Sequence, residues 1–314
     1  MKPGATEMAT HGTGRVLARL LMLMVALGAL RCRTDLRPAN PTPRRFEVQG
    51  HRGCRGLLPE NTLAAFEHAA ALGVDVLELD LGLTRDGVLV VAHDPQANPD
   101  LCLGVDRLPT RDIKDLTFAQ LERLDCGSRS NPRFPDQRPV PGARMPRLEE
   151  VLDLLGRRDG LQANLEVKTF PDRRSATAPP ASFAETLVPL LLRRGLERRV
   201  TIQSFDPLAL REVAKLAGGR LALSALADRR EDFEPMLRST GARILSPRHT
   251  ELRRADVVRF RRRGVRLIPW TVNEPARMRE LMDWGVDGLI TDRPDRLLRL
   301  LRRSPAADPL PHDG

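Results

Sequence analysis

Hydrophobic and polar positions follow two periods along the chain, and from residue 46 onward the two periods alternate. Short apolar runs suited to strands are followed by stretches in which apolar residues recur every three or four positions, as in amphipathic helices. Strands are expected at 46–50, 76–83 with a continuation at 88–92, 161–167, 200–204, 220–226, 242–246, 266–272 and 288–291. Helices are expected at 62–72, 147–155, 182–193, 207–217, 231–239, 253–263, 275–283 and 294–302. Eight strands, each followed by a helix, predict an α/β protein of the (β/α)8 TIM barrel class.

Two segments interrupt this alternation. Asp86-Gly87 has the composition of a hairpin turn, so the second strand is expected to fold back as a short ribbon that carries His93 to the barrel rim. The proline-rich segment 95–146 is too long for an ordinary connection between a strand and a helix. We interpret it as a loop-rich insertion after the second strand, with a helix at 118–124, that covers the catalytic face as a lid. A decorative subdomain is the alternative.

Both ends of the chain differ from the barrel in composition. Residues 1–32 have the pattern of an export signal, because Arg15 and Arg19 precede an apolar run at 20–30 that is too short to span a membrane. The expected organisation is a leader at 1–32, a linker at 33–45, the barrel at 46–303 and a disordered tail at 304–314. The protein is therefore expected to be exported, to the periplasm or outside the cell.

The cysteines are interpreted with that location in mind. Cys32 stands where a bacterial lipoprotein would be cleaved, but the bulky, charged Arg31 precedes it, so a lipid anchor at Cys32 stays an open alternative. Cys102 and Cys126 both lie in the insertion, and an oxidising compartment would allow them to form a disulfide. Cys54 is interpreted as a small packing residue.

The formal net charge of +10 raises the question of an acidic partner. The positive charge comes mainly from arginines scattered over the predicted helices, and aromatic residues make up 4% of the chain. Binding to nucleic acid would need clustered basic residues and stacking platforms, so no nucleic-acid partner is expected. A solvated arginine-rich surface is the simpler interpretation, and firm membrane contact is expected only through an anchor at Cys32. The oligomeric state is not indicated.

Carboxylates occupy one face of the strand predicted at 76–83. Side chains in a strand alternate between faces, so Glu78 and Asp80 share one face, about 7 Å apart, and leucines share the other. Burying such a pair is unfavourable unless a cation or a proton compensates the charge. Hard oxygen ligands favour one divalent cation, Ca²⁺ or Mg²⁺. The alternative is a solvated acidic face on an edge strand.

The same alternation places Glu166 and Lys168 together on the strand at 161–167, within the sequence NLEVK. Glu166 can complete the protein ligands of a cation site, and Lys168 can offer a positive charge to a phosphate. An internal salt bridge between the two residues is the alternative, and both interpretations can hold together.

Two histidines bracket the first pair of carboxylates, and each ends an extended run. Imidazole is the side chain best suited to move protons near neutral pH, so His51 and His93 indicate acid–base catalysis. Structural packing is the alternative for each. Because strand C-termini form the active site of such barrels, these residues are expected to converge with Gln203 and Trp270.

Nine short motifs stand in order along the chain: HRG, PENT, ELD, TRDG, VVAHDP, NLEVK, QSF, PWTVN and GVDGLITDRP. Together they resemble the glycerophosphodiester phosphodiesterase family, over nearly all of the chain after residue 45. The resemblance implies a small-molecule glycerophosphodiester as substrate, with glycerol 3-phosphate and an alcohol as products. It also implies roles by residue: Glu78, Asp80 and Glu166 as metal ligands, His51 and His93 as the acid–base pair, and Arg52 and Lys168 as phosphate ligands.

The expected mechanism is metal-assisted displacement at phosphorus. One histidine removes a proton from the glycerol 2-hydroxyl and the other protonates the leaving alcohol, after which water opens the cyclic phosphate. The sequence does not assign the two roles. Gln203 and Trp270 are expected to bind substrate, with barrel packing as the alternative for Trp270.

Other functions stay open at this point. A phospholipase-type phosphodiesterase acting on intact lipids would use the same barrel, and a lid with exposed aromatics would favour it; the insertion contains Phe118 and Phe134. A glycoside hydrolase would leave the two histidines without a task. A non-catalytic exported binding barrel is the alternative from another class, although every candidate site residue is present.

Overall fold

The computed structural model of the protein describes Met1 and residues 45–303. The expected leader with Cys32, nearly all of the linker, and the expected tail at 304–314 lie outside the described residues. None of the helices described between residues 45 and 303 is long and apolar enough to cross a membrane.

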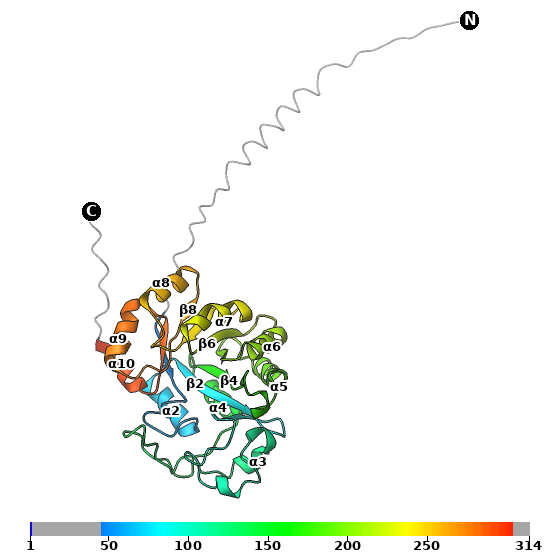
Figure 1. The fold of residues 1–314 in the computed structure, drawn as a ribbon, viewed down its shortest axis with the longest axis vertical. Helices are drawn as coiled ribbons and strands as arrows, with labels where there is room; N and C mark the ends of the chain where they lie inside the picture. The colour runs from blue at the N-terminus through cyan, green and yellow to red at the C-terminus, as the bar shows by residue number, and fades with distance from the viewer. Residues whose placement is uncertain (2–44, 304–314) are drawn as a thin grey trace. The chain divides into compact units, whose positions relative to one another are not determined.

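Eight parallel strands form a nearly closed barrel (Figure 1), in the order β8-β7-β6-β5-β4-β2-β1-β9. The strands are β1 Glu47–Gly50, β2 Val76–Leu83, β4 Gln162–Val167, β5 Val200–Ser204, β6 Ala222–Ala227, β7 Ile244–Pro247, β8 Arg266–Leu267 and β9 Gly288–Thr291. Backbone hydrogen bonds bridge the seam between the last two strands, from Ile290 N to Pro269 O at 3.0 Å and from Val272 N to Ile290 O at 3.0 Å. The predicted (β/α)8 TIM barrel is therefore confirmed.

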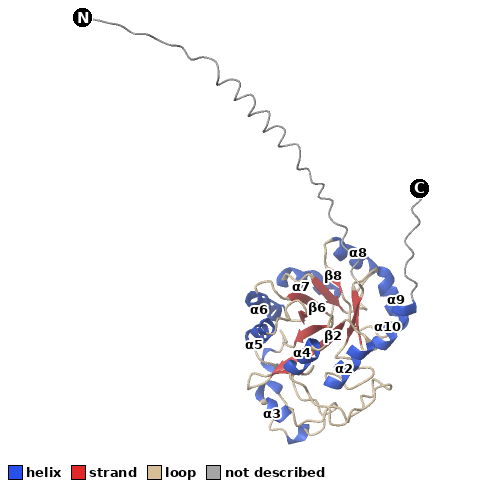
Figure 2. Cartoon of the chain, turned by 180° about the vertical axis from the view of Figure 1, so that it is seen from behind, coloured by secondary structure: helices blue, strands red, loops and turns tan. Residues whose placement is uncertain are grey.

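The helices surround the strands as an outer ring, which is seen from the back of the molecule in Figure 2. They are α2 Leu63–Leu72, α4 Leu148–Gly156, α5 Pro180–Arg193, α6 Pro207–Ala217, α7 Phe233–Thr240, α8 Arg254–Arg262, α9 Pro275–Trp284 and α10 Pro294–Arg303. Thr62 caps α2 by accepting a hydrogen bond from Ala65 N, and Gly73 ends it in the left-handed conformation with φ of 94°. Local capping signals thus position α2 as the sequence predicts.

Burial on both faces of the sheet explains the character of β2. Leu77, Leu79 and Leu81 are fully buried in the core between barrel and helices, and burial of a leucine side chain contributes about 1.5–3 kcal/mol. The alternate positions carry Glu78 and Asp80 into the barrel interior, where they are 1% and 0% exposed. The alternative of a solvated acidic edge strand is wrong, because β2 lies between β1 and β4.

The strand expected at 266–272 is much shorter than predicted. β8 ends at Leu267, and the chain then continues as a single bridge between Trp270 and Arg248. Pro269 has no N–H to donate, so a regular ladder cannot continue through this position. The helix expected from 231 also begins later, because the 3₁₀ turn η4 at Arg230–Asp232 precedes α7.

A ribbon and an irregular segment follow β2. The short strand β3, Leu89–Val91, pairs antiparallel with β2 through the turn at Gly87, whose φ is 77°. The following segment contains the 3₁₀ turns η1 Val105–Arg107 and η2 Ile113–Asp115 and the helix α3 Phe118–Leu121, and η3 Arg174–Ala176 lies after β4. The helix α3 is shorter than the expected 118–124. The segment has its own apolar cluster, which includes Ile113, Leu116 and Leu121.

The insertion is tied to the barrel and to itself. A disulfide joins Cys102 to Cys126. Gln137 Nε2 donates to Arg55 O at 2.7 Å and to Leu58 O at 3.2 Å, in the loop that follows β1. The far arm of the insertion is therefore fastened across the first loop of the barrel.

Candidate active site

The first loop of the site leaves the end of β1 in a tight turn. Gly50 has no room for a side chain, since a Cβ there would lie 2.1 Å from the Gly53 carbonyl oxygen. Arg52 adopts the left-handed conformation with φ of 49°, which is uncommon for residues other than glycine. Its N–H donates to Glu78 Oε2 at 3.0 Å. The turn therefore fixes His51 and Arg52 over the carboxylates of β2.

His51 is buried and is held by a carboxylate that follows β9. Its Nδ1 atom lies 2.6 Å from Asp292 Oδ1. Asp292 accepts further hydrogen bonds from Arg55 Nε at 3.0 Å and Asn273 Nδ2 at 2.7 Å. Burial lowers the pKa of His51 to about 4 against the opposing attraction of Asp292, so the imidazole is neutral at pH 7. With the Nδ1 proton donated to Asp292, Nε2 is the atom that can accept a proton.

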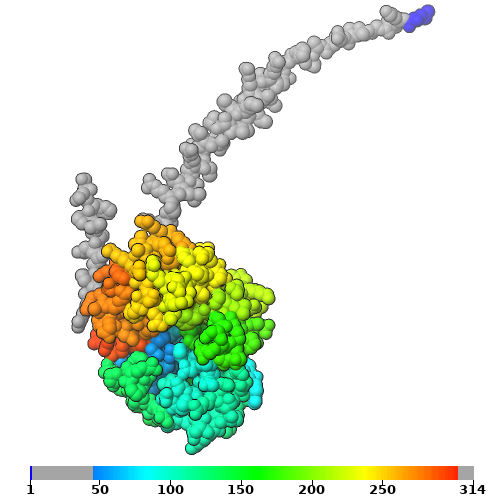
Figure 3. Space-filling view, in the orientation of Figure 1, coloured from blue at the N-terminus to red at the C-terminus, as the bar shows by residue number. Residues whose placement is uncertain are grey.

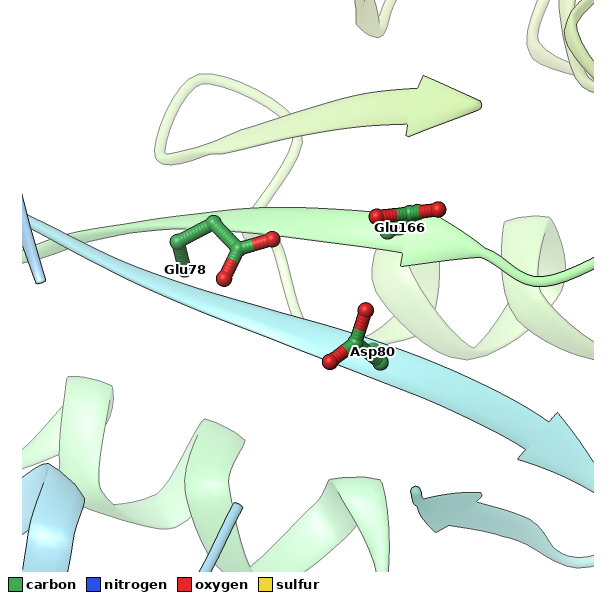
Figure 4. A group of neighbouring side chains, drawn as sticks. All are labelled: Glu78, Asp80 and Glu166. Atoms are coloured by element: carbon green, nitrogen blue, oxygen red, sulfur yellow. The ribbon is translucent and has the colours of Figure 1, made fainter. Parts of the chain in front are cut away.

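Three carboxylates gather where β2 and β4 lie side by side (Figure 4). Asp80 is in register with Glu166, and Glu78 lies two residues earlier on the same face of β2. One oxygen from each side chain lies within 4.8 Å of the other two. All three residues are buried. The structure thus brings together acidic residues from two strands, although Asp80 and Glu166 are 86 positions apart in the sequence.

Two buried cations face this acidic triad without balancing it. Lys168 Nζ lies 2.7 Å from Glu166 Oε1 and 3.6 Å from Asp80 Oδ1, and Arg52 Nε lies 3.2 Å from Asp80 Oδ2. Burial raises the pKa of Glu78 well above its usual range, and the neighbouring carboxylates raise it further. Burial acts in the same direction on Asp80, but Arg52 and Lys168 together hold the pKa of Asp80 well below its usual range. Two cations thus face three carboxylates, and the side chain of Glu78 lacks a compensating charge.

The donor set fits a divalent cation that prefers oxygen ligands. Asp80 Oδ1 is buried and accepts no hydrogen bond from any side chain or backbone group within residues 45–303. The other oxygens are oriented by amides: Gln203 Nε2 donates to Glu78 Oε1 at 2.7 Å, and Asn61 Nδ2 donates to Asp80 Oδ2 at 2.9 Å. Gln203, expected to bind substrate, also accepts from Asn164 at 2.9 Å, so its amide is engaged in holding the triad. A bound cation would remove the charge imbalance.

His93 reaches the site from the ribbon that follows β2. Its Nδ1 atom lies 2.8 Å from Asp94 Oδ1, and Asn98 Nδ2 donates to Asp94 Oδ2 at 2.8 Å. The side chain of His93 is 35% exposed, compared with 11% for His51. Both histidines are therefore oriented through Nδ1 by a carboxylate, but one is buried and the other meets solvent.

A cavity of about 460 Å³ opens at the C-terminal ends of the strands, and we call it the barrel-mouth cavity. Trp270 and Phe205 form an apolar part of its wall, with ring centroids 5.4 Å apart and planes at 88°. Trp270 Nε1 donates to Ser246 O at 2.8 Å, so this residue both packs in the barrel and faces the cavity. The predicted residues that line it are His51, Arg52, Glu78, His93, Glu166, Lys168, Gln203 and Trp270. Asp80 lies beneath them.

The cysteines take no part in this constellation. Cys54 donates its thiol to Ala65 O at 3.3 Å, and burial raises the pKa of the Cys54 thiol to about 12, so no thiolate forms near neutral pH. Cys102 and Cys126 lie in the insertion and are not among the residues of the barrel-mouth cavity.

Several supporting residues were not identified from the sequence. Asp292, Asn273 and Asn61 stand within the quoted motifs GVDGLITDRP, PWTVN and PENT, so the signal was available as motif membership. Arg55 carries no such signal. Its role against Asp292 depends on a contact between residues 237 positions apart.

The fold and the site together define a TIM-barrel enzyme that places acidic and basic groups at the strand C-termini. Its family follows from known proteins. The profile of the Glycerophosphoryl diester phosphodiesterase family matches residues 51–296. A glycerophosphodiester phosphodiesterase from Caldanaerobacter subterraneus is 35% identical over 82% of this chain and 98% of its own length. One from Bacillus subtilis is 31% identical over 81% of this chain and 86% of its own. The chain belongs to the glycerophosphodiester phosphodiesterase family.

Solved structures agree with this assignment. A crystal structure from Silicibacter pomeroyi, described as a candidate glycerophosphoryl diester phosphodiesterase, has a TM-score of 0.76 and 32% identity. It covers 83% of this chain and 94% of its own. A phosphodiesterase from Oleispira antarctica, solved in complex with the product sn-glycerol-3-phosphate, has a TM-score of 0.69 at 22% identity and covers 82% of this chain and 96% of its own. The latter likeness shows the fold.

Proposed function

We propose that this chain hydrolyses small-molecule glycerophosphodiesters to glycerol 3-phosphate and an alcohol, using two histidines and one divalent cation. The observation that carries the proposal is the pairing of two carboxylate-oriented histidines with a buried acidic triad in one cavity. The product named for the Oleispira relative supports glycerol 3-phosphate as the product here.

Glu78, Asp80 and Glu166 would hold the cation. Their all-oxygen donor set suits Ca²⁺ or Mg²⁺. When bound, such a cation would supply positive charge that lowers the pKa of a hydroxyl and neutralises charge on a phosphate. Gln203 and Asn61 keep the carboxylate oxygens oriented, so the site is preorganised for this ligand.

The two histidines take different roles in this proposal. Neutral His51 accepts the proton of the glycerol 2-hydroxyl at Nε2, and that oxygen forms a bond to phosphorus. His93 donates a proton to the leaving alcohol oxygen as its bond to phosphorus breaks. Water then opens the resulting cyclic phosphate, with the two histidines in reversed roles. The charges of Arg52 and Lys168 lie beside the triad, where they would attract the phosphate oxygens.

Activity assays with metal depletion test this function. The purified chain would be given glycerophosphocholine, and release of glycerol 3-phosphate would be measured before and after EDTA and after resupply of Ca²⁺ or Mg²⁺. We expect activity that disappears with the chelator and returns with one cation. Folded protein that is inactive on several glycerophosphodiesters would contradict the proposal.

We also propose that the protein is exported, in agreement with the pattern of residues 1–32. The disulfide between Cys102 and Cys126 supports an oxidising compartment, since such bonds are rare in the cytosol. Fractionation of cells that express the full chain tests this, and recovery of the protein with cytosolic markers would contradict it.

A further inference from the structure

A second cavity, of about 620 Å³, lies beside the barrel-mouth cavity, and we call it the insertion cavity. Its walls come from the loop after β1, the loop after β3 and the arm of the insertion at 129–133. Figure 3 shows a recess on this face, with atoms from the start of the barrel visible between the insertion and the later strands and helices. The two cavities share Arg52, Arg55 and His93.

The histidines are divided unequally between the cavities. His93 lines both of them, whereas His51 lines only the barrel-mouth cavity. A phosphodiester held at the shared Arg52 would extend one branch into each cavity. The branch whose hydroxyl faces His51 then lies in the barrel mouth, and the branch whose oxygen receives a proton from His93 extends into the insertion cavity. This division rests on the proposed function.

The insertion cavity carries positive charge that has no recorded partner among residues 45–303. Arg129 and Arg133 are exposed, and within residues 45–303 their guanidinium groups make no ion pair or hydrogen bond that the structure records. The arginines at the shared edge differ, because Arg52 pairs with Glu60 at 2.5 Å and Arg55 with Asp292 at 3.0 Å.

The acidic residues of the same cavity leave a surplus of positive charge. Glu60 is engaged by Arg52 at 2.5 Å, and Asp94 by His93 at 2.8 Å. Asp100 is the remaining lining carboxylate. Two unengaged guanidinium groups therefore face one unengaged carboxylate in the described lining, which favours an anionic ligand.

Hydrogen bonds within the insertion hold the arm that carries these arginines. Asn131 N donates to Gln137 Oε1 at 3.2 Å, and Arg133 N donates to Asn131 Oδ1 at 3.1 Å. Gln137 is bound to the loop after β1, and the Cys102–Cys126 disulfide lies at the base of the arm. The cavity is thus preformed, so binding there does not require the ordering of a free loop.

We propose that the insertion cavity binds the leaving alcohol and that Arg129 and Arg133 recognise an anionic group, a carboxylate or a phosphate, on that alcohol. A flexible arginine in such a cavity forms charge-assisted hydrogen bonds to either group. The insertion thereby selects among glycerophosphodiesters by the charge of the head group.

A matched pair of substrates tests this selection. Glycerophosphoserine and glycerophosphoethanolamine differ by one carboxylate on the leaving alcohol. We expect kcat/KM for glycerophosphoserine to be about 10-fold higher than for glycerophosphoethanolamine. The ratio of these two kcat/KM values should fall towards one in the R129Q/R133Q double variant. The preference should also weaken as NaCl rises from 50 to 500 mM (about 14 to about 4 Å in screening length), because both arginines are exposed. Arg123→Gln, an exposed arginine of the insertion outside the cavity, should keep the wild-type ratio.

A second pair separates the two anionic groups. Glycerophosphoglycerol is compared with the same diester carrying a terminal phosphate. In either pair, a higher kcat/KM for the substrate with the added anionic group that is lost in the double variant supports the proposal and names the anion. Equal kcat/KM values within both pairs, or a preference that survives in R129Q/R133Q, would overturn it. Inactivity on all four diesters would instead count against the proposed function.

Discussion

His51 Nδ1 and Asp292 Oδ1 lie 2.6 Å apart, although 241 positions separate the two residues. The contact joins the first and last strands of the barrel at its catalytic end, because β1 and β9 are parallel neighbours. It selects the imidazole tautomer in which Nε2 accepts a proton. Burial raises the pKa of Asp292, but His51 and Arg55 together hold that pKa well below its usual range, so Asp292 stays ionised.

Removing this carboxylate is expected to impair catalysis more than folding. In Asp292→Ala, kcat should fall roughly 100-fold, since His51 loses its orientation and tautomer. The acidic limb of the pH–rate profile should also move to lower pH, because the attraction of Asp292 raises the pKa of His51. Steady-state kinetics and circular dichroism measure both effects. Asp283→Asn, an exposed substitution on α9, is the control and should keep the wild-type kcat. If kcat of Asp292→Ala stayed within twofold of wild type, the role of Asp292 in orienting His51 would be refuted.

Each histidine should be indispensable to a similar degree. His51→Ala and His93→Ala are each expected to lower kcat by roughly 10²- to 10⁴-fold, the usual contribution of positioned proton transfer. The kcat of the double variant should be only slightly lower than that of the less active single variant, because the two residues act on one reaction as a unit. Turnover of glycerophosphocholine measures this. Near wild-type activity in either single variant would rule out the mechanism.

Cation binding should be visible in stability without any assay of turnover. Ca²⁺ or Mg²⁺ should raise Tm after EDTA treatment, by an amount equivalent to about 2.7 kcal/mol when the ion is present at about 100 times its Kd. Glu78→Gln should reduce this rise, since it removes one ligand of the triad. Glu185→Gln, on the exposed face of α5, should leave it unchanged. A Tm independent of both ions would contradict the site.

Acid stability should depend on Asp256. This buried residue accepts hydrogen bonds from Arg230 Nε at 2.8 Å and Arg230 Nη2 at 2.9 Å. Burial raises the pKa of Asp256, but the hydrogen bonds from Arg230 and from the Arg253 N–H, together with the charges of Arg230 and Arg259, outweigh burial and lower the pKa. Its folded pKa therefore lies below the unfolded value of about 3.9. The contribution to stability is fully present above that value and is lost as pH falls through the folded pKa.

Urea unfolding at a series of pH values measures that effect. Asp256→Asn should lower the free energy of unfolding at pH 7 and should flatten its decline below pH about 4. Asp283→Asn is again the matched exposed control. A parallel decline in wild type and Asp256→Asn would show that Asp256 does not contribute.

The disulfide should be detectable by mass. When the unfolded chain is alkylated without reductant, Cys102 and Cys126 should stay unlabelled, and reduction should expose two further sites. Replacement of both by serine should lower stability by about 3 kcal/mol, through the added freedom of the unfolded loop. Equal labelling with and without reductant would show that the bond does not form.

Much of the barrel could be predicted because its signals are local. Helix caps and apolar periods depend on neighbouring residues, so α6 begins and ends where expected, at Pro207 and Ala217. The alternation in β2 likewise separates the core leucines from Glu78 and Asp80. The end of β8 was missed, although Pro269 was available as a signal that a ladder cannot continue.

The sequence by itself determined the strand and helix periods, the residues with chemical groups and, through its motifs, the family. Only the tertiary structure decided how these groups meet. Asp292 is hydrogen-bonded to His51, Gln203 donates to Glu78, and Gln137 of the insertion donates to the Arg55 carbonyl oxygen. These pairs join strands and loops that are distant in the chain. Their hydrogen bonds and burial leave no period in the sequence, because they depend on how the barrel closes and not on neighbouring residues.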